Sequence, residues 1–235
     1  IHADKELIIE GGNVSITKSY EGIEAQVVIF NGGDITIYSN DDGINASGGV
    51  DGSSTNRPGM GAFDADLDCT LTINGGNIYI NSAGDGVDSN GYIYINGGYL
   101  VVDGPTNNGN GALDSGAGIV MNGGEVIALG SSGMAVDLGD TLSIYNVSIY
   151  FDEKLPSGTT IAIIDSDNDK ILEYTSAKTF SHAAIGSPDF VLGKTYYIYI
   201  DDNEYEQFTI NNVTTVVGKT DYFLNSRPRN NSRKR

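Results

Sequence analysis

The sequence has little of several residue types that would define other classes of protein. A single cysteine, Cys69, excludes an internal disulfide and therefore a small scaffold held together by cystines. No run of apolar residues approaches membrane-spanning length and no signal peptide is recognised, so we expect no membrane insertion. Tryptophan is absent, which removes the largest aromatic side chain available for stacking on a ligand.

Positive charge is also scarce. The formal net charge is −18, and five of the 13 Lys and Arg residues lie within residues 227–235. No cationic side chain stands between Arg57 and Lys154. Such an acidic chain repels nucleic acid and anionic membranes, so we expect no nucleic-acid partner, and an anionic partner would need bridging cations.

Glycine, by contrast, is abundant and marks two repeated elements. One is EGG or NGG followed by an alternating strand, with its first glycines at Gly11, Gly32, Gly75, Gly97 and Gly123. The gaps between these glycines are 21, 43, 22 and 26 residues. The other element carries an apolar residue that should point inward, at Ile23, Ile44, Phe63, Val87, Leu113 and Val136. The second series divides the long gap, so we expect two turns there, one with a degenerate corner.

This period of roughly 20 to 26 residues, built from short strands and glycine corners without a helical pattern, predicts an all-β fold. We expect a parallel β-helix of about six to seven coils over residues 1–150, with LSIYNVSIYFD as the last coil. The residues IHA fit the same period, so the chain is expected to begin inside a repeat. Residues 151–222 should form an antiparallel β cap on the open end, and the basic segment 223–235 is expected to be disordered.

The residue before each Gly-Gly pair should form a ladder at one corner of the coils. These residues are Glu10, Asn31, Asn74, Asn96 and Asn122. Stacked asparagine side chains can satisfy the polar groups of a turn, so we interpret this ladder as structural.

The same alignment gathers acids and amides into two columns. One step after the inward residue lie Glu24, Asn45, Asp64, Asp88 and Asp114, with Asp137 and His2 at the ends. Two steps before it lie Glu21, Asp42 and Asp85, and the long gap adds Asp66 and Asp68 nearby. Carboxylates in register on adjacent coils sit roughly 5 Å apart. Uncompensated like charges at that distance raise one another's pKa and weaken the fold.

Lys and Arg cannot compensate these columns, so we expect Ca²⁺, a hard cation that takes six to eight oxygen ligands. The predicted ligands are Glu21, Glu24, Asp42, Asn45, Asp64, Asp66, Asp68, Asp85, Asp88 and Asp114. The alternative is a solvated acidic edge whose Asp and Asn residues merely favour turns. A further acidic run, DSDNDK at 165–170, imitates the start of a calcium loop. It has Lys170 and Ser176 where such a loop needs glycine and an acid, so we interpret it as a hairpin turn.

Several runs together resemble a known family. They are DDGINASGG, GDGVDSNGYIYINGG, GPTNNGNGALD and GSSGM, followed by IIDSDNDKIL and GKTYYIYI. They are similar to bacterial surface or secreted right-handed parallel β-helix proteins related to polysaccharide lyases. The resemblance implies calcium, an extracellular or cell-surface location, and binding of cellulose or of acidic plant polysaccharides such as polygalacturonate. The chain departs from the family at residues 47–61 and at its start in mid-repeat.

Three functions fit these features. The first is a monomeric, calcium-dependent binder of plant cell-wall polysaccharide, in which incompletely coordinated calcium contacts sugar carboxylates. The second is a calcium-dependent lyase, which would need an Arg or Lys base, yet the repeats offer only Lys5, Lys18 and Arg57. The third is a stiff surface spacer or adhesin arm. We single out no catalytic residue and do not expect an enzyme.

A neutral glucan would need aromatic stacking platforms instead of cations. Tyr79, Tyr92, Tyr94 and Tyr99 fall on two adjoining coils, and Tyr92 and Tyr94 should face outward beside each other. We take Tyr79, Tyr92 and Tyr94 as candidate carbohydrate-binding residues. Tyrosine also favours strands for its own sake, so these residues could equally be plain strand surface.

Overall fold

The computed structural model describes residues 1–47, 65–139 and 144–218. These residues form strands, turns and bends, and no helix, so none of them makes an apolar helix that could cross a membrane. The all-β prediction is confirmed. The predicted tail 223–235 lies outside the described residues.

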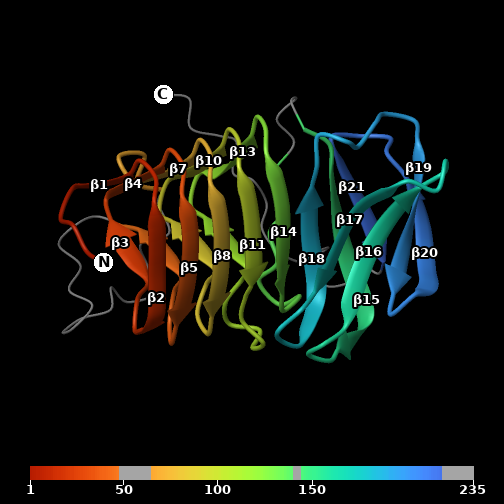
Figure 1. The fold of residues 1–235 in the computed structure, drawn as a ribbon, viewed down its shortest axis with the longest axis horizontal. Coiled ribbons are helices and arrows are strands. Elements are labelled where there is room, and N and C mark those ends of the chain that lie inside the picture. Colours follow the sequence, from red (N-terminus) through yellow and green to blue (C-terminus); the bar gives the residue numbers. More distant parts are fainter. Residues whose placement is uncertain (48–64, 140–143, 219–235) are drawn as a thin grey trace, which may run out of the picture.

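The described residues in 1–47 and 65–139 contribute parallel strands to three sheets, which the chain visits in rotation (Figure 1). The first sheet contains β1 (Glu6–Ile9), β4 (Val27–Phe30), β7 (Thr70–Ile73), β10 (Tyr92–Ile95) and β13 (Gly118–Met121). The second contains β2 (Asn13–Ser19), β5 (Asp34–Ser39), β8 (Asn77–Ser82), β11 (Tyr99–Asp103) and β14 (Glu125–Gly130). The third contains β3 (Ile23–Ala25), β6 (Ile44–Ala46), β9 (Val87–Ser89) and β12 (Leu113–Ser115).

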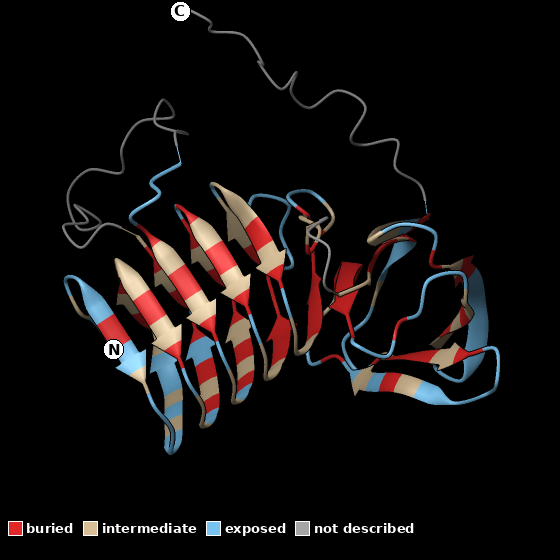
Figure 2. Ribbon diagram, turned by 90° about the horizontal axis from the view of Figure 1, so that it is seen from above, coloured by how far each residue is buried: buried red, intermediate tan, exposed pale blue. Residues whose placement is uncertain are grey.

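Alternation along the strands separates an apolar interior from a polar outside. Figure 2 shows buried and half-buried residues alternating along the strands of these sheets. The predicted inward residues Ile23, Ile44, Val87 and Leu113 are at most 2% exposed and belong to one core enclosed by the three sheets. Their burial confirms the phase of the repeat, because a one-residue slip would turn every inward side chain outward.

The expected number of turns is wrong. Within the described residues there are four complete sets of three strands and a fifth set with β13 and β14 only. The 43-residue gap is one turn, since β4 pairs directly with β7, β5 with β8 and β6 with β9. The extra length is therefore an insertion between β6 and β7. The apolar-acidic pair at 63–64, from which the sequence predicts another strand of the third sheet, lies outside the described residues.

The asparagine ladder is confirmed and runs in a single direction. Asn122 Nδ2 donates to Asn96 Oδ1, Asn96 to Asn74, and Asn74 to Asn31, each at 2.8 Å, and Asn31 donates to Glu10 Oε2 at 2.9 Å. The glycines beside the ladder allow the turns to stack closely. At Gly76, where φ is +98°, an added Cβ would lie 2.8 Å from the carbonyl oxygen of Gly33.

The C-terminal region adds antiparallel strands. β18 (Phe180–Gly186) pairs antiparallel with β14, and β15 (Asn146–Leu155) and β21 (Thr214–Gly218) extend the same sheet to eight strands. A second, four-stranded sheet contains β16 (Thr160–Asp165), β17 (Lys170–Thr175), β19 (Thr195–Ile200) and β20 (Asn203–Thr209). The region thus continues the parallel stack at β14 through the antiparallel strand β18, and β15 and β21 beyond it pair in parallel with each other.

The last parallel coil expected at LSIYNVSIYFD does not form. β15 crosses the expected boundary at residue 150 and lies one strand away from β14, because β18 is inserted between them. Burial on both faces explains this arrangement. Ile127 and Leu129 of β14 face a second core, formed with the C-terminal region, while Val126 and Ala128 face the first. β18 is buried along its whole length, so it fits the position beside β14 between the two cores.

Candidate functional site

The third sheet presents the first predicted column in register. Glu24 pairs with Asn45, Asn45 with Asp88, and Asp88 with Asp114, while His2 forms an isolated bridge to Glu24. His2 Nδ1 lies 3.0 Å from Glu24 Oε2. At the His2 end, therefore, a neighbouring imidazole contacts the column, and the hydrogen bond to Glu24 raises the pKa of His2.

The prediction includes Asp64 in this column, between Asn45 and Asp88. The residue itself lies outside the described part of the chain, but β6 and β9 are direct neighbours, so no strand fits between Asn45 and Asp88. No strand position is therefore left between Asn45 and Asp88, and Asp64 as a calcium ligand stays a prediction.

The second column, Glu21, Asp42 and Asp85, precedes the same strands. Asp85 N donates to Asp42 Oδ1 at 2.7 Å, and Gly111 N donates to Asp85 Oδ1 at 2.5 Å. These bonds link three successive turns of the chain and hold the two carboxylates at the edge of the third sheet. Each aspartate accepts from the backbone of the next turn, which fixes where its remaining oxygen points.

Three carboxylates from the two columns converge. One oxygen each from Asp42, Asp85 and Asp88 lies within 4.8 Å of the others, and all three residues are half-buried. Burial raises the pKa of Asp85 to about 7, with the charge of Asp42 adding to the effect against the Gly111 hydrogen bond. Burial also raises the pKa of Asp88 to about 8, with repulsion from Asp114 and Asp85 as the next causes.

The surroundings of this Asp42–Asp85–Asp88 triad supply oxygen atoms and no basic side chain. The described part of the chain has no Lys or Arg between Lys18 and Lys154. Asn45 Oδ1, beside Asp88 in the column, is buried and accepts no hydrogen bond from the described residues. A set of oxygen donors without nitrogen or sulfur ligands suits Ca²⁺ better than a transition metal.

The remaining predicted ligands divide into two groups. Glu21, Glu24 and Asp114 belong to the same columns as the triad, and the charges of Asp114 and Glu21 act on Asp88. Asp66 and Asp68 are exposed in a turn before β7, where Asp68 N donates to Asp66 Oδ1 at 3.1 Å. The triad does not include this pair. Burial raises the pKa of the nearby Cys69 to about 12, with Asp66 contributing, so this thiol stays protonated.

The candidate tyrosines separate into two places. Tyr92 and Tyr94 lie beside each other on the first sheet, half-buried, with ring centroids 5.5 Å apart, as expected. Tyr79 and Tyr99 lie on the second sheet, so the tyrosines of the two adjoining turns do not form one platform. Tyr174 of β17 joins Tyr79 and Tyr99 around a pocket, and sequence reasoning missed it because it is 71 residues from Asp103, to which its hydroxyl is bonded.

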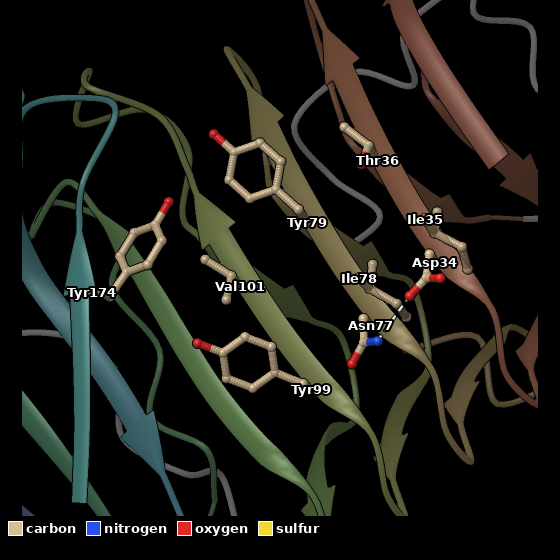
Figure 3. A pocket seen from close by; sticks show the side chains of 9 residues that line it. All are labelled: Asp34, Ile35, Thr36, Asn77, Ile78, Tyr79, Tyr99, Val101 and Tyr174. Atoms are coloured by element: carbon tan, nitrogen blue, oxygen red, sulfur yellow. Dashed lines mark hydrogen bonds between the residues drawn. The ribbon is translucent and has the colours of Figure 1, made fainter. Parts of the chain in front are cut away.

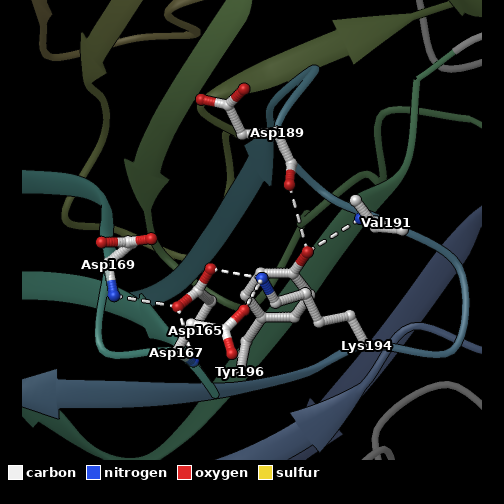
Figure 4. A network of polar contacts seen from close by, with 7 residues as sticks. All are labelled: Asp165, Asp167, Asp169, Asp189, Val191, Lys194 and Tyr196. Carbon is white, nitrogen blue, oxygen red and sulfur yellow. Dashed lines mark hydrogen bonds and ion pairs between the residues drawn. The ribbon is translucent and has the colours of Figure 1, made fainter.

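The acidic run at 165–170 is a hairpin turn, as expected, and it already has a cation (Figure 4). Lys194 Nζ lies 2.6 Å from Asp165 Oδ2 and 2.8 Å from Asp167 Oδ2. The backbone amides of Asp167 and Asp169 both donate to Asp165 Oδ1 at 2.9 Å. The Lys194 hydrogen bond holds the pKa of Asp165 below its usual range. Lys194 therefore compensates the negative charge of this turn, as a bound metal ion would.

A Ser–His pair also occurs, but it is closed to solvent. Ser148 Oγ lies 2.8 Å from His182 Nε2, and the two residues are 0% and 2% exposed. Burial lowers the pKa of His182 to about 3. Neither side chain could contact a substrate, so the pair contributes to packing in the eight-stranded sheet.

His182 should make the protein sensitive to acid. The unfolded histidine binds a proton near its ordinary pKa of 6.5 and the folded one only near 3, so stability is lost as pH falls between these values. At pH 5 the loss should be about 2 kcal/mol relative to neutral pH. The free energy of unfolding, measured with urea, should therefore fall less between pH 7 and pH 5 for His182→Gln than for the unaltered protein. The exposed His2→Gln variant should lose stability with falling pH as the unaltered protein does. The same pH dependence of the free energy of unfolding in all three proteins would contradict His182 as the source of the acid sensitivity.

Comparison of the chain with protein-family models, with curated proteins and with solved structures gave no significant match. The family resemblance of the sequence motifs therefore stays a prediction. The chemistry of the triad and of the tyrosine-lined pocket is consequently what indicates a function.

Proposed function

We propose that this protein binds Ca²⁺ on its third sheet and, through the bound cation, an acidic polysaccharide such as polygalacturonate. The observation that carries the proposal is the Asp42–Asp85–Asp88 triad, three convergent carboxylates without a basic neighbour in the described part of the chain. Burial, with the neighbouring carboxylates adding to it, raises the pKa values of Asp85 and Asp88, and a divalent cation would stabilise their ionised forms. Asn45 Oδ1 would add a neutral ligand.

Charge supports a bridging role for the cation. At a net charge of −18 the protein alone repels a uronate chain. Calcium takes six to eight oxygen ligands, and the triad offers fewer, so open positions would remain for sugar carboxylates and hydroxyls. We propose binding without cleavage, because a lyase needs a basic side chain beside the metal to remove a proton.

The fold and setting proposed with this function are those of the family that the sequence resembles. The cyclic visits to three parallel sheets support a right-handed parallel β-helix, and the resemblance supports a monomer at the bacterial surface or outside the cell. Cellulose is the second ligand that the resemblance suggests. A calcium-stabilised spacer would share the metal centre but would bind no polymer.

Retention on immobilised polygalacturonate tests the proposal. In millimolar CaCl₂ the protein should be retained, and EDTA should release it, while moderate NaCl should not. Asp88→Asn should lose most of the retention because it removes one charged ligand. Asp202→Asn makes the same change of charge at an exposed residue with a φ of 65°, which asparagine tolerates, and should behave like the unaltered protein.

The alternatives give different results in the same assay. A lyase would release unsaturated products that absorb ultraviolet light, and a spacer would not be retained at all. Retention that survives EDTA would overturn the bridging cation, and release by salt alone would indicate simple electrostatic contact.

A further inference from the structure

A groove of about 370 Å³ lies on the outer face of the second sheet, next to Tyr174 of the C-terminal region (Figure 3). Its floor comes from β5, β8 and β11, and Tyr174 of β17 stands at its side. The volume falls in the lower part of the range for small-molecule sites, about 300–1,000 Å³. The groove is remote from the triad in the fold, since it belongs to a different sheet.

Three tyrosine rings give the groove its apolar character. Figure 3 shows Tyr79, Tyr99 and Tyr174 arranged around Val101. Two of the rings are fixed from behind, because the hydroxyls of Tyr79 and Tyr174 donate to Asp103 Oδ2 at 2.9 Å and 2.6 Å. Their positions are therefore set before any ligand arrives, which lowers the entropy cost of binding.

Polar groups lie beside the rings at one end of the groove. Asn77 Nδ2 donates to Asp34 Oδ1 at 2.8 Å, which fixes both side chains against the floor. Within the described residues, Asn77 Oδ1 and Asp34 Oδ2 make no further hydrogen bond, so both remain acceptors for ligand hydroxyls. Thr36 adds a hydroxyl at the far side.

The charge of the groove selects against an anionic ligand. No Lys, Arg or His belongs to the described residues that line it, and Asp34 contributes a carboxylate. A uronate placed here would meet a like charge and no cation. A neutral sugar, by contrast, offers apolar ring faces to the tyrosines and hydroxyl donors to the two acceptor oxygens.

We propose that this groove binds a neutral hexose oligosaccharide, by stacking on Tyr99 and its neighbours and by hydrogen bonds to Asn77 and Asp34. The binding needs no calcium. It would give the protein a second glycan specificity on a face separate from the triad, and it does not depend on the proposed role of the triad.

Calorimetric titration with cellohexaose, and with maltohexaose to compare linkages, tests this site. Binding of at least one of the two should be measurable and should be unchanged by EDTA. Tyr99→Leu, which keeps apolar bulk but removes the ring face, should raise Kd about tenfold. Thr36→Arg, which places a long side chain over the floor, should weaken binding at least as much.

Tyr199→Leu is the matched control, since it makes the same replacement at a half-buried tyrosine of β19, in the four-stranded sheet. It should leave Kd unchanged. Circular dichroism melts of each variant show whether it is folded, and Thr36→Arg alters a side chain outside both cores. The proposal is overturned if neither hexasaccharide binds, if Tyr199→Leu weakens binding as much as Tyr99→Leu, or if EDTA abolishes binding. Failure of polygalacturonate retention with intact hexasaccharide binding would instead count against the triad alone.

Discussion

Removing calcium should lower the melting temperature of this protein by about 5–10 °C at pH 8. A ligand present at a hundred times its Kd stabilises the folded state by about 2.7 kcal/mol, and each kcal/mol shifts the melting temperature of a chain of this size by about 2–4 °C. The physical source is the Asp42–Asp85–Asp88 triad, whose carboxylates repel one another when no cation is bound. Melts in millimolar CaCl₂ and in EDTA measure the difference.

The stabilisation by calcium should be larger at pH 8 than at pH 5. The pKa values of Asp85 and Asp88, about 7 and about 8, lie above the ordinary 3.8, so the metal-free folded protein binds more protons than the unfolded chain between pH 4 and 8. These two groups therefore make the metal-free protein less stable as pH rises through that window. Calcium needs the carboxylates ionised, so the difference between the CaCl₂ and EDTA melts should shrink from pH 8 to pH 5.

Variants separate the pH dependence caused by Asp85 and Asp88 from that of His182, which makes stability change with pH in the opposite direction. Asp88→Asn should raise the melting temperature in EDTA, because one repelling charge is gone, and should abolish most of the calcium shift. Asp202→Asn should do neither. A melting temperature that EDTA leaves unchanged at pH 8 would remove the metal centre and, with it, the proposed bridge to the polysaccharide.

Asp103→Ala should destabilise the protein by about 3–5 kcal/mol, which corresponds to roughly 10 °C or more in melting temperature. Asp103 is 1% exposed at the end of β11 and accepts hydrogen bonds from both parts of the chain. Tyr79 donates from the parallel sheet, while Tyr174, Ser176 and the backbone amide of Ala177 donate from the C-terminal region. Truncation would leave these donors, among them the buried Ser176, without their shared acceptor.

Graded variants should distinguish this Asp103 network from a general loss of acidity. Tyr174→Phe removes one bond to a charged acceptor and should cost about 1.5–3 kcal/mol. Asp189→Ala removes an exposed carboxylate and should change stability by less than about 0.5 kcal/mol. Guanidinium unfolding of the three variants measures the series. An Asp103→Ala protein as stable as Asp189→Ala would show that the network does not hold the two regions together.

Local periodicity explains which features the sequence could predict. The inward residues, the asparagine ladder and the in-register pairs of Asn45, Asp88 and Asp114 all follow from a repeat whose phase is visible residue by residue. The repeat also predicts that Asp42 and Asp85 lie in one column. Only their convergence with Asp88 could not be predicted from the repeat and is seen in the structure.

Features that depend on distant pairing could not be predicted. The sequence at 63–64 imitates the repeat, and nothing local distinguishes an inserted segment from an additional strand of the third sheet. The insertion of β18 between β14 and β15 joins strands that are not neighbours in the chain, through burial on both faces. Tyr174 reaches the groove only because the Asp103 network brings β17 against the second sheet.

The asparagine ladder has a consequence for how such a chain can change. The Asn74–Asn31 bond joins turns 43 residues apart in sequence and has the same 2.8 Å length as bonds between turns 22 or 26 residues apart. The corner that carries the ladder thus fixes the spacing of the stack regardless of how much chain lies between its members. New segments can accumulate at the other corners without disturbing neighbouring turns. The corner with the asparagine ladder then stays constant, while the length of chain at the other corners can vary.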